Sequence, residues 1–428
     1  MSMIKLALDS TTGSPVIPED LSKELTELTL KQCPLLSLLP AKQANGATHS
    51  FIKVSSLPYP NFVGEKAEGT SSSATFTRAS VTTKIIKMID GVTDYLIASA
   101  GSFINAYNLE LELARKGFGY KLESYLLWGN ATADPYQFDG FDAQITTNRI
   151  QHNAVVDLPL LTRQMLAKVR KNAPMDNLVF ICDPEMADKI SSLQTQIYKT
   201  MSTKEVEVDG GFIMETIKRI PIYESSYCMA GPANPATITA TASSTSGQMT
   251  TGATYKYRLS AVTINGEQGA SAEATVTLNN SKTSVDLTWT ANSDAYLYKI
   301  YRTEANGGAN TEKIVAVIPG YTYDANGDIN GCKTSYNDGA PDTAIGSDVF
   351  LLEGESVIFL IDRDVANPVA INAGALQSIS AGEKVTDLIL FKKLASTNDA
   401  EKFMLFSYIA LENRNELCHA IARKVKLA

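Results

Sequence analysis

The stretch from residue 225 to residue 255 contains no Asp, Glu, Lys or Arg, and it is rich in Ala, Thr, Ser, Gly and Pro. Such an abrupt change of composition is typical of a domain boundary. Beyond it, apolar and polar residues alternate in short, evenly spaced segments, which predicts a small β-sandwich. After about Ile345 the pattern returns to mixed α/β. We therefore expect the sandwich to be inserted into one larger α+β domain.

An extended hairpin is predicted before the insert. Residues 48–54 and 80–89 are β-branched and strand-like, and the run between them is polar and charged. A two-stranded ribbon buries too little apolar area to be stable alone, so it needs another surface, which a neighbouring subunit would supply. Salt links from the tip to that subunit make Glu65, Lys66, Glu68 and Arg78 the candidate inter-subunit contact residues.

A long amphipathic helix is predicted at residues 102–128, where apolar side chains recur three and four positions apart. Ser102 is the expected N-cap, and Gly129 stands where a left-handed residue would end the helix. Gly117 and Gly119 each cost about 1 kcal/mol of helix propensity, so they mark either a bend or a close packing contact.

Residues 155–223 predict a compact α+β layer with a buried strand at 178–182 and a helix that begins at Asp183. Residues 15–40 predict a short amphipathic arm that begins as a helix. The apolar strands expected after Ile345 complete the larger domain.

The composition argues against several classes of protein. A net charge of -8 disfavours a surface that grips phosphate backbones. No apolar run approaches the roughly 20 residues that a membrane helix needs, and the N-terminus lacks the apolar centre of a secretory signal. Five scattered cysteines, with no Cys-x-x-Cys pair, are typical of reduced thiols.

Motifs for catalysis are missing from the sequence. His49, His152 and His419 are too dispersed for a zinc motif, and neither a Gly-x-Ser-x-Gly elbow nor a phosphate-binding loop occurs. Residues 324–331 resemble the start of a calcium loop, but Ile329 and Ser335 occupy positions that need Gly and Glu. We expect a polar hairpin loop there, and we expect no enzyme activity, metal or cofactor.

The order of elements resembles the major capsid protein of tailed bacteriophages, the Johnson fold that encapsulin nanocompartments also use. Residues 126–141, 177–184 and 211–225 carry the resemblance most clearly, and it covers about 15–230 and 345–428. It implies an α+β fold with an extended β-hairpin loop, a long spine helix and an axial domain. The implied divisions are an N-terminal arm (1–41), the extended loop (42–101), the spine helix and peripheral domain (102–150), the axial domain (151–230 and 346–384), the insert (231–345) and peripheral strands (385–428).

The insert resembles an immunoglobulin-like or fibronectin type III module. Tyr255, Tyr257 and Leu259 alternate on one expected strand, and Leu287 and Trp289 on another. The usual fibronectin order places the Leu-x-Trp strand first, whereas here it comes second, so the strand order stays open.

The resemblance implies a shell protein whose hexamers and pentamers enclose double-stranded DNA without sequence-specific contact. Its implied location is the virion capsid, assembled in the host bacterial cytoplasm. Implied partners are further copies of the chain, a portal protein, minor or decoration proteins, and a separate scaffolding protein, because only about forty residues precede the hairpin. No membrane partner is expected. An encapsulin-like compartment and a surface or glycan-binding β-sandwich protein are the alternatives.

Overall fold

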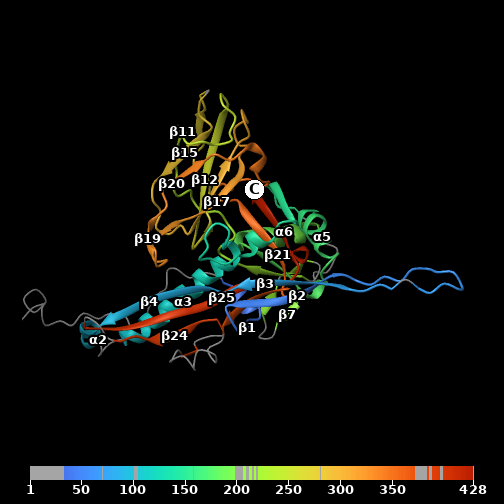
Figure 1. Ribbon diagram of the computed structural model, residues 1–428. Coiled ribbons are helices and arrows are strands. Elements are labelled where there is room, and N and C mark those ends of the chain that lie inside the picture. Colours follow the sequence, from blue (N-terminus) through green and yellow to red (C-terminus); the bar gives the residue numbers. More distant parts are fainter. Residues whose placement is uncertain are drawn as a thin grey trace, which may run out of the picture.

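The computed structural model describes residues 33–69, 71–100, 105–157, 159–197, 206–208, 212–214, 216–217, 220–279, 281–371, 383–384, 388–395 and 399–427. Figure 1 shows a long layer in the lower part of the view, an α/β body above it, a β-rich part at the top and a thin ribbon that extends to the right. The predicted helical start of the N-terminal arm, before residue 33, lies outside the described residues.

The long layer is a six-stranded sheet with a long helix beside it, for which we keep the name spine helix as a label. Its strands are β1 (Lys42–Ala44), β4 (Lys84–Thr93), β22 (Ala366–Ile371), β23 (Glu383–Lys384), β24 (Leu390–Lys393) and β25 (Ala400–Asn413). The helices of this layer are α1 (Leu35–Leu38), α2 (Asp94–Ala100) and α3 (Ala106–Trp128). Tyr107 of α3 packs edge-on against Phe403 of β25, with 5.7 Å between the ring centroids.

The spine helix α3 agrees with the predicted helix in its body and differs at both caps. It begins at Ala106, and the Asn105 side chain accepts a hydrogen bond from the Asn108 backbone N–H at 3.1 Å. The predicted cap Ser102 lies outside the described residues. Gly129 follows the helix with φ of -56°, so it is not left-handed as predicted. A side chain is excluded there because a Cβ would lie 2.5 Å from the Phe138 carbonyl oxygen.

The body contains a second six-stranded sheet, with the order β5-β26-β21-β6-β10-β9. Its strands are β5 (Arg149–Val155), β6 (Leu178–Cys182), β9 (Thr216–Ile217), β10 (Ile220–Glu224), β21 (Ser356–Asp362) and β26 (Ala420–Lys426). The helical segments and remaining short strands are α4 (Phe141–Gln144), η2 (Leu160–Leu166), α5 (Ala167–Val169), η3 (Met175–Asn177), α6 (Pro184–Ile197), η6 (Glu416–Cys418), β7 (Val206–Val208) and β8 (Phe212–Met214). The buried strand predicted at 178–182 is confirmed, and Asp183 accepts a hydrogen bond from the Glu185 backbone N–H at 3.1 Å.

Two strands join a different sheet from the one that sequence order suggests. We expected residues 385–428 to lie beside the spine helix, and β24 and β25 do so. The last strand, β26, instead pairs with β21 and β5 in the second sheet, because Ala420, Ala422 and Val425 pack into the apolar core of the body. Conversely, β22 is part of the segment 346–384, which was expected in the axial domain, but it pairs with β25 in the long sheet.

The extended hairpin is also built from different strands than expected. β2 (Thr48–Ser56) pairs antiparallel with β3 (Thr75–Thr82). The predicted second strand, 80–89, is split at Thr83, whose backbone N–H donates to the Ala47 carbonyl at 2.8 Å. Residues after that point form β4, which pairs with β25 along ten positions of register.

The top part of the molecule is formed by residues between 238 and 345. One sheet joins β11 (Ile238–Ser243), β15 (Ser284–Trp289) and β20 (Ser335–Asp338); the other joins β12 (Thr254–Thr263), β13 (Gly266–Glu267), β14 (Ala274–Thr277), β16 (Leu297–Arg302) and β17 (Lys313–Pro319). β18 (Tyr321–Tyr323) and β19 (Ile329–Cys332) form a separate hairpin, and η4 (Asp342–Ala344) follows β20. Buried Tyr257, Leu259 and Leu287 come from both sheets and share one core. The predicted inserted β segment is therefore two-layered.

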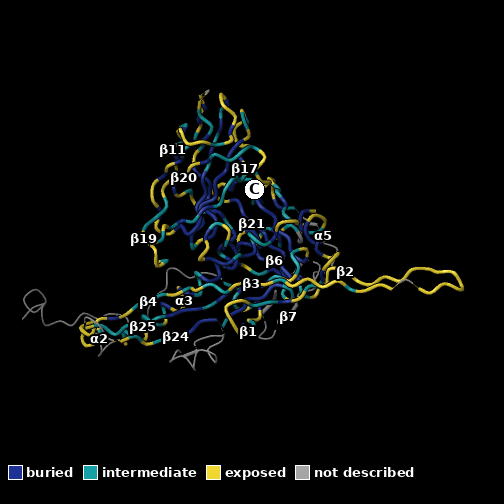
Figure 2. Tube along the Cα trace, viewed as in Figure 1, coloured by how far each residue is buried: buried dark blue, intermediate teal, exposed yellow. Residues whose placement is uncertain are grey.

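The insert is not an isolated unit, because its lower end shares a core with the spine helix. Tyr296 and Leu297 belong to the same buried cluster as Leu126 and Trp128. The Tyr296 hydroxyl is 2.8 Å from the hydroxyl of Ser124 on α3. Figure 2 shows the buried interior running from the top part into the body without a break.

Candidate assembly surface

The β2–β3 hairpin presents an apolar stripe to solvent. Side chains directly opposite each other in an antiparallel pair lie on the same face, and Val54 is paired with Phe76 while Ile52 is paired with Arg78. The exposed fractions are 71% for Ile52, 56% for Val54 and 64% for Phe76. Contiguous apolar side chains left exposed on a surface are typical of an interaction site. We call Ile52, Val54 and Phe76 the hairpin stripe.

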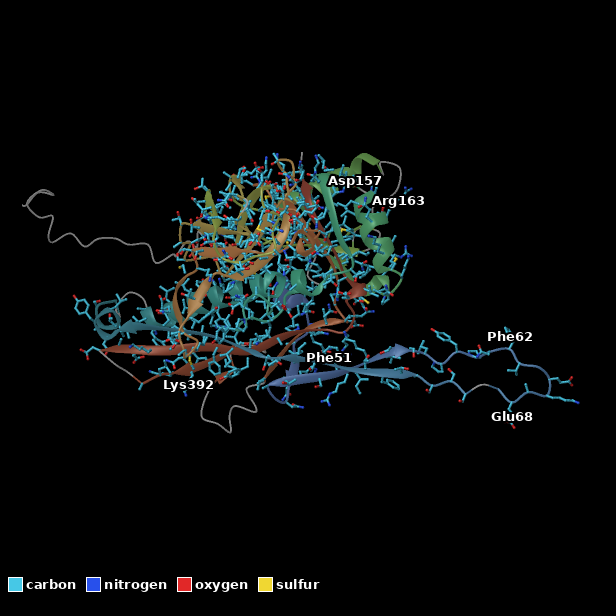
Figure 3. All side chains as sticks on the ribbon, turned by 45° about the horizontal axis from the view of Figure 1, so that its top comes forward. Phe51, Phe62, Glu68, Asp157, Arg163 and Lys392 are labelled. Atoms are coloured by element: carbon cyan, nitrogen blue, oxygen red, sulfur yellow. The ribbon has the colours of Figure 1, made fainter. Side chains whose placement is uncertain are left out.

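The apolar character continues into the extended tip. Leu57, Tyr59, Phe62 and Val63 are all exposed, and the Phe62 side chain makes almost no contact with the rest of the chain. Figure 2 shows the described residues of the tip as exposed, and Figure 3 shows Phe62 and Glu68 on its two sides. Among the residues that the structure describes, these four large apolar side chains are left mostly in contact with solvent, so burial within the described part of the chain accounts for little of their apolar surface.

The predicted contact residues fall into two groups. Glu65, Lys66 and Glu68 are exposed together in the tip, next to a turn closed by the Ala67 backbone N–H and the Gly64 carbonyl at 2.9 Å. Arg78 lies away from them on the ribbon, where its guanidinium donates to the Ser50 hydroxyl at 3.1 Å. The prediction from sequence selected these four residues because they are charged and could form salt links. The apolar stripe was missed, although Ile52, Val54 and Phe76 alternate with polar residues in the sequence.

A second set of exposed apolar side chains runs along β4 to α2, which lies at the other end of the long layer. Ile85 and Ile89 project from β4 with exposed fractions of 64% and 59%, and Tyr95 of α2 is 84% exposed. Leu96 of α2 is also exposed. Figure 1 shows α2 at one end of the long layer and the hairpin leaving the other end. We call Ile85, Ile89, Tyr95 and Leu96 the β4 patch.

A groove borders the β4 patch beneath the insert. It has a volume of about 490 Å³ and is lined by Ile85 and Lys87 of β4, Tyr136, and Ile329 of β19. Tyr323 of β18 donates its hydroxyl to the Asp134 carboxylate at 2.6 Å, which fixes the β18–β19 hairpin above the groove. The turn at 324–328 is closed by the Asp324 carboxylate, which accepts the backbone N–H groups of Asn326 and Asp328. This is the polar hairpin loop expected from the sequence.

Buried charges join the insert to the body. Glu267 of β13 is fully buried and accepts hydrogen bonds from Lys299 at 2.7 Å and from Arg423 of β26 at 2.8 Å. Asp142 of α4 also accepts from Lys299 at 2.7 Å, and Arg149 bridges Asp142 and Asp348. We call these side chains the junction cluster: Asp142, Arg149, Glu267, Lys299, Asp348 and Arg423.

The junction cluster balances its own charge, with three acids and three bases. Burial alone would raise the pKa of Asp142, but Lys299, Arg149 and Arg423 outweigh burial and hold that pKa below its usual range. Burial likewise opposes ionisation of Glu267, and Arg423 and Lys299 still lower its pKa. Ion pairs this deeply buried require good geometry and complete pairing. The cluster therefore links residues of the insert to residues of the body through buried ion pairs.

The residues screened for chemistry do not come together. His49 lies near Glu412. His152 is a residue of β5, and His419 is buried beside Asp362 and Asn413. Within the described ranges, no group of three or more His, Cys, Asp and Glu side chains could hold a metal ion. No disulfide joins the five cysteines, all of which are described. A helix long and apolar enough to span a membrane is not found in the part of the chain that the structure covers.

Comparison with solved structures confirms the capsid fold predicted from the order of elements. The chain aligns with the holo-SrpI encapsulin complex from Synechococcus elongatus PCC 7942 with a TM-score of 0.50 and 9% identity, over 99% of this chain and 98% of that chain. It aligns equally well with the cyanophage A-1(L) capsid asymmetric unit, at a TM-score of 0.50 and 12% identity, over 98% of this chain and 99% of that chain. A comparison with curated protein sequences returns no match.

The structural likeness shows a fold that phage capsids and encapsulins share, so it does not choose between them. The match of the sequence to a family model distinguishes between the two. The model of the family described as SU10 major capsid protein matches residues 6–227, just over half of the chain. The chain belongs to the SU10 major capsid protein family and is a structural protein of a phage capsid.

Proposed function

We propose that this capsid protein associates head to tail into hexamers and pentamers, and that these rings close an icosahedral shell around packaged double-stranded DNA. The observation that carries the proposal is the hairpin, an exposed ribbon whose apolar stripe has no partner surface within the described part of the chain. The stripe and tip of one subunit would dock on the β4 patch of the next.

The positions of the two surfaces favour rings over simple pairs. The hairpin stripe lies on the ribbon that leaves one end of the long layer, and the β4 patch runs along β4 toward α2 at the other end, so a contact between them joins two different surfaces. Such a heterologous contact repeats around an axis and closes when the rotation allows. Each joint is modest in area, and the shell gains its stability from many joints acting together.

We propose that residues 231–345 form an immunoglobulin-like sandwich that projects from the outer surface. The insert rises from one side of the long layer along which the hairpin and β4 extend, so a shell wall parallel to that layer would carry the insert on one face (Figure 1). The divisions 1–41, 42–101, 102–150, 151–230 with 346–384, and 385–428 are proposed as arm, extended loop, spine, axial domain and peripheral strands. Two strands are exceptions: β26 belongs to the second sheet, with the proposed axial domain, and β22 belongs to the long sheet, with the proposed peripheral strands.

The other proposed partners follow from the same role. A separate scaffolding protein would guide ring closure, a portal protein would occupy one vertex, and minor or decoration proteins would bind the outer face. A net charge of -8 is consistent with a shell that surrounds DNA without binding its phosphate backbone tightly. Assembly would take place in the host bacterial cytoplasm. Glu65, Lys66, Glu68 and Arg78 would form the polar rim of each joint, where single ion pairs contribute little.

A compartment that holds protein cargo is the second candidate, because the encapsulin complex is as similar in fold as the cyanophage capsid. The contents of purified particles separate the two. Double-stranded DNA and portal protein support the viral shell, whereas a single enriched enzyme without nucleic acid supports the compartment.

The assembly proposal is tested by two charge substitutions, one on each surface. Phe76→Asp and Ile89→Asp should each stop ring and shell formation, because each buries a carboxylate in an apolar joint. Thr77→Asp is the matched control, since Thr77 is an exposed neighbour of Phe76 and points to the other face of the ribbon. Size-exclusion chromatography and negative-stain electron microscopy, with and without a candidate scaffold, give the readout.

Mixing the two defective variants tests the head-to-tail geometry. The pair retains one sound joint, between the hairpin of the Ile89→Asp chain and the patch of the Phe76→Asp chain, so heterodimers should form without closed rings. Shells from either variant alone, or equal failure of Thr77→Asp, would show that the stripe does not carry the assembly contact.

A further inference from the structure

The groove beneath the insert is an open apolar site whose insert wall is held in place. Ile85 of β4, Tyr136 and Ile329 of β19 line it, and all three side chains are exposed. The Tyr136 ring packs against the Tyr323 ring of β18, with 4.6 Å between the centroids, so the wall is formed before anything binds. The volume of about 490 Å³ is within the range of pockets that enclose small ligands, so the groove has room for an aromatic side chain.

Charged side chains of both signs border the groove. Lys87 is exposed on β4, and Lys84 begins the same strand and donates its Nζ to the Pro135 carbonyl at 2.6 Å. Asp328 is exposed in the turn before β19, on the insert wall. The groove therefore offers cations on its β4 side and a carboxylate on its insert side. A complementary segment would carry an apolar side chain together with acids and a base.

The hairpin tip has this composition. Phe62 and Val63 are exposed, and Glu65, Lys66 and Glu68 are exposed a few positions further along. The two acids complement the lysines of β4, and Lys66 complements the carboxylate of the insert wall. Figure 1 shows the hairpin extending to one side of the molecule and β19 lying on the other, so the tip fits the groove of another copy and not its own.

The lengths of the two surfaces also agree. Val54 and the turn at Gly64 are ten positions apart, and Lys84 and Asp94 are ten positions apart. At about 3.3 Å per residue, each stretch spans roughly 33 Å. In a head-to-tail contact the α2 end of the next subunit faces the root of the hairpin. A hairpin stripe that begins beside α2 therefore brings the tip to Lys84 and the groove.

On the basis of the head-to-tail rings proposed above, we propose that the hairpin tip of one subunit occupies the groove beneath the insert of the next. Phe62 would pack against Tyr136 and Ile329 of the next subunit, and Glu65 would face Lys87. The β18–β19 hairpin of the insert then covers the tip of the neighbouring chain. The insert is thus part of every joint in the ring, and the charges at the groove fix the direction and register of the hairpin.

Disulfide trapping in assembled particles tests the direction and register. A chain with Phe62→Cys and Ile329→Cys, in a Cys332→Ser background that removes the native thiol of β19, should form disulfides between subunits when copper phenanthroline oxidises the two thiols. Non-reducing gels should then show a ladder of covalent oligomers. Phe62→Cys with Tyr95→Cys is the matched control, because Tyr95 lies at the α2 end of the β4 patch. A ladder from the control pair alone would mean the opposite register and would overturn the proposal.

Charge reversal tests the complementarity. Glu65→Lys combined with Glu68→Lys places like charges against Lys87, so the protein concentration needed for shells should rise at least roughly tenfold. Adding Lys87→Glu should restore assembly. Adding Lys392→Glu should not, because Lys392 lies on β24 and does not line the groove. Equal rescue by the two lysine variants would show that only net charge matters.

This inference and the proposed joint fail in different ways. If Phe76→Asp and Ile89→Asp stop assembly but the Phe62–Ile329 pair gives no ladder, the joint between stripe and patch stands and the placement of the tip is wrong. Shells that persist in both aspartate variants would overturn the joint itself, and the placement of the tip with it.

Discussion

At the scale of single residues, His419 is a buried imidazole that the fold keeps neutral. The Asp362 backbone N–H donates to Nδ1 at 3.1 Å, so the proton resides on Nε2, which faces the Asn413 side-chain oxygen at 3.2 Å. Burial lowers the pKa of His419 to about 4, and the nearby Glu416 opposes that shift only weakly. The histidine that looked unremarkable in the sequence therefore links folding to pH.

The unfolded chain binds a proton at His419 below about pH 6.5, whereas the folded chain does so only below about pH 4. The free energy of unfolding should therefore fall as the pH is lowered from 6.5 to 4, by an amount on the order of 3 kcal/mol from this residue. Urea unfolding of unassembled wild type and His419→Asn over this range measures the difference. Parallel pH profiles for the two proteins would contradict the prediction.

At the scale of elements, the Asn265–Gly266 turn shows how closely the insert approaches the spine helix. Gly266 has φ of +83°, and a Cβ there would lie 2.2 Å from the Tyr227 carbonyl oxygen and 3.2 Å from Nε1 of Trp128. An Asn-Gly pair between two strands is typical of a tight hairpin turn. The Tyr227 backbone also requires glycine at this position, because its carbonyl oxygen leaves no room for a Cβ. The turn alone would not impose this second requirement.

Gly266→Ala and Gly117→Ala form a matched pair of substitutions. Gly266→Ala should destabilise the chain by at least about 1 to 3 kcal/mol, because it combines a left-handed backbone with a steric clash. Gly117 lies exposed inside α3 with nothing near its Cβ position, so Gly117→Ala should stabilise by up to about 1 kcal/mol. Chemical unfolding of both unassembled variants gives the two free energies, and a stabilising Gly266→Ala would refute the account.

The order of elements could be predicted from sequence because it depends on local patterns. The apolar spacing of α3 and the Val-Ile-rich run of β6 each identify an element without reference to distant residues. The choice of partner is not local: β3 and β4 follow one another, and only the presence of β25 separates them into two sheets. The hairpin stripe was missed for the same reason, since alternation in a strand does not reveal whether a second layer covers it.

At the scale of the whole molecule, the insert and the body are joined by an ion cluster that draws residues from both. Glu267 and Lys299 come from the insert, and Arg423 comes from the final strand of the body. Glu267→Gln removes a negative charge that pairs with Arg423 and Lys299, so two buried positive charges are no longer balanced. The substitution should lower the free energy of unfolding by about 3–5 kcal/mol. Adding Lys299→Met restores the charge balance, so the double variant should be more stable than Glu267→Gln alone. Glu401→Gln, in a solvent-exposed pair, should cause no measurable change.

The two tryptophans of the chain report separately on the two parts, because Trp289 lies in the insert and Trp128 ends the spine helix. An independently stable insert would unfold at its own denaturant concentration, and Glu267→Gln, a change within the insert, would then leave the Trp128 transition of the body unchanged. A shared core and a shared ion cluster instead require one cooperative unit. In single-tryptophan versions made with Trp128→Phe or Trp289→Phe, the two fluorescence transitions should shift together when Glu267 is replaced. Separate transitions would mean that the insert is an attached module and that the junction cluster does not couple it to the capsid fold.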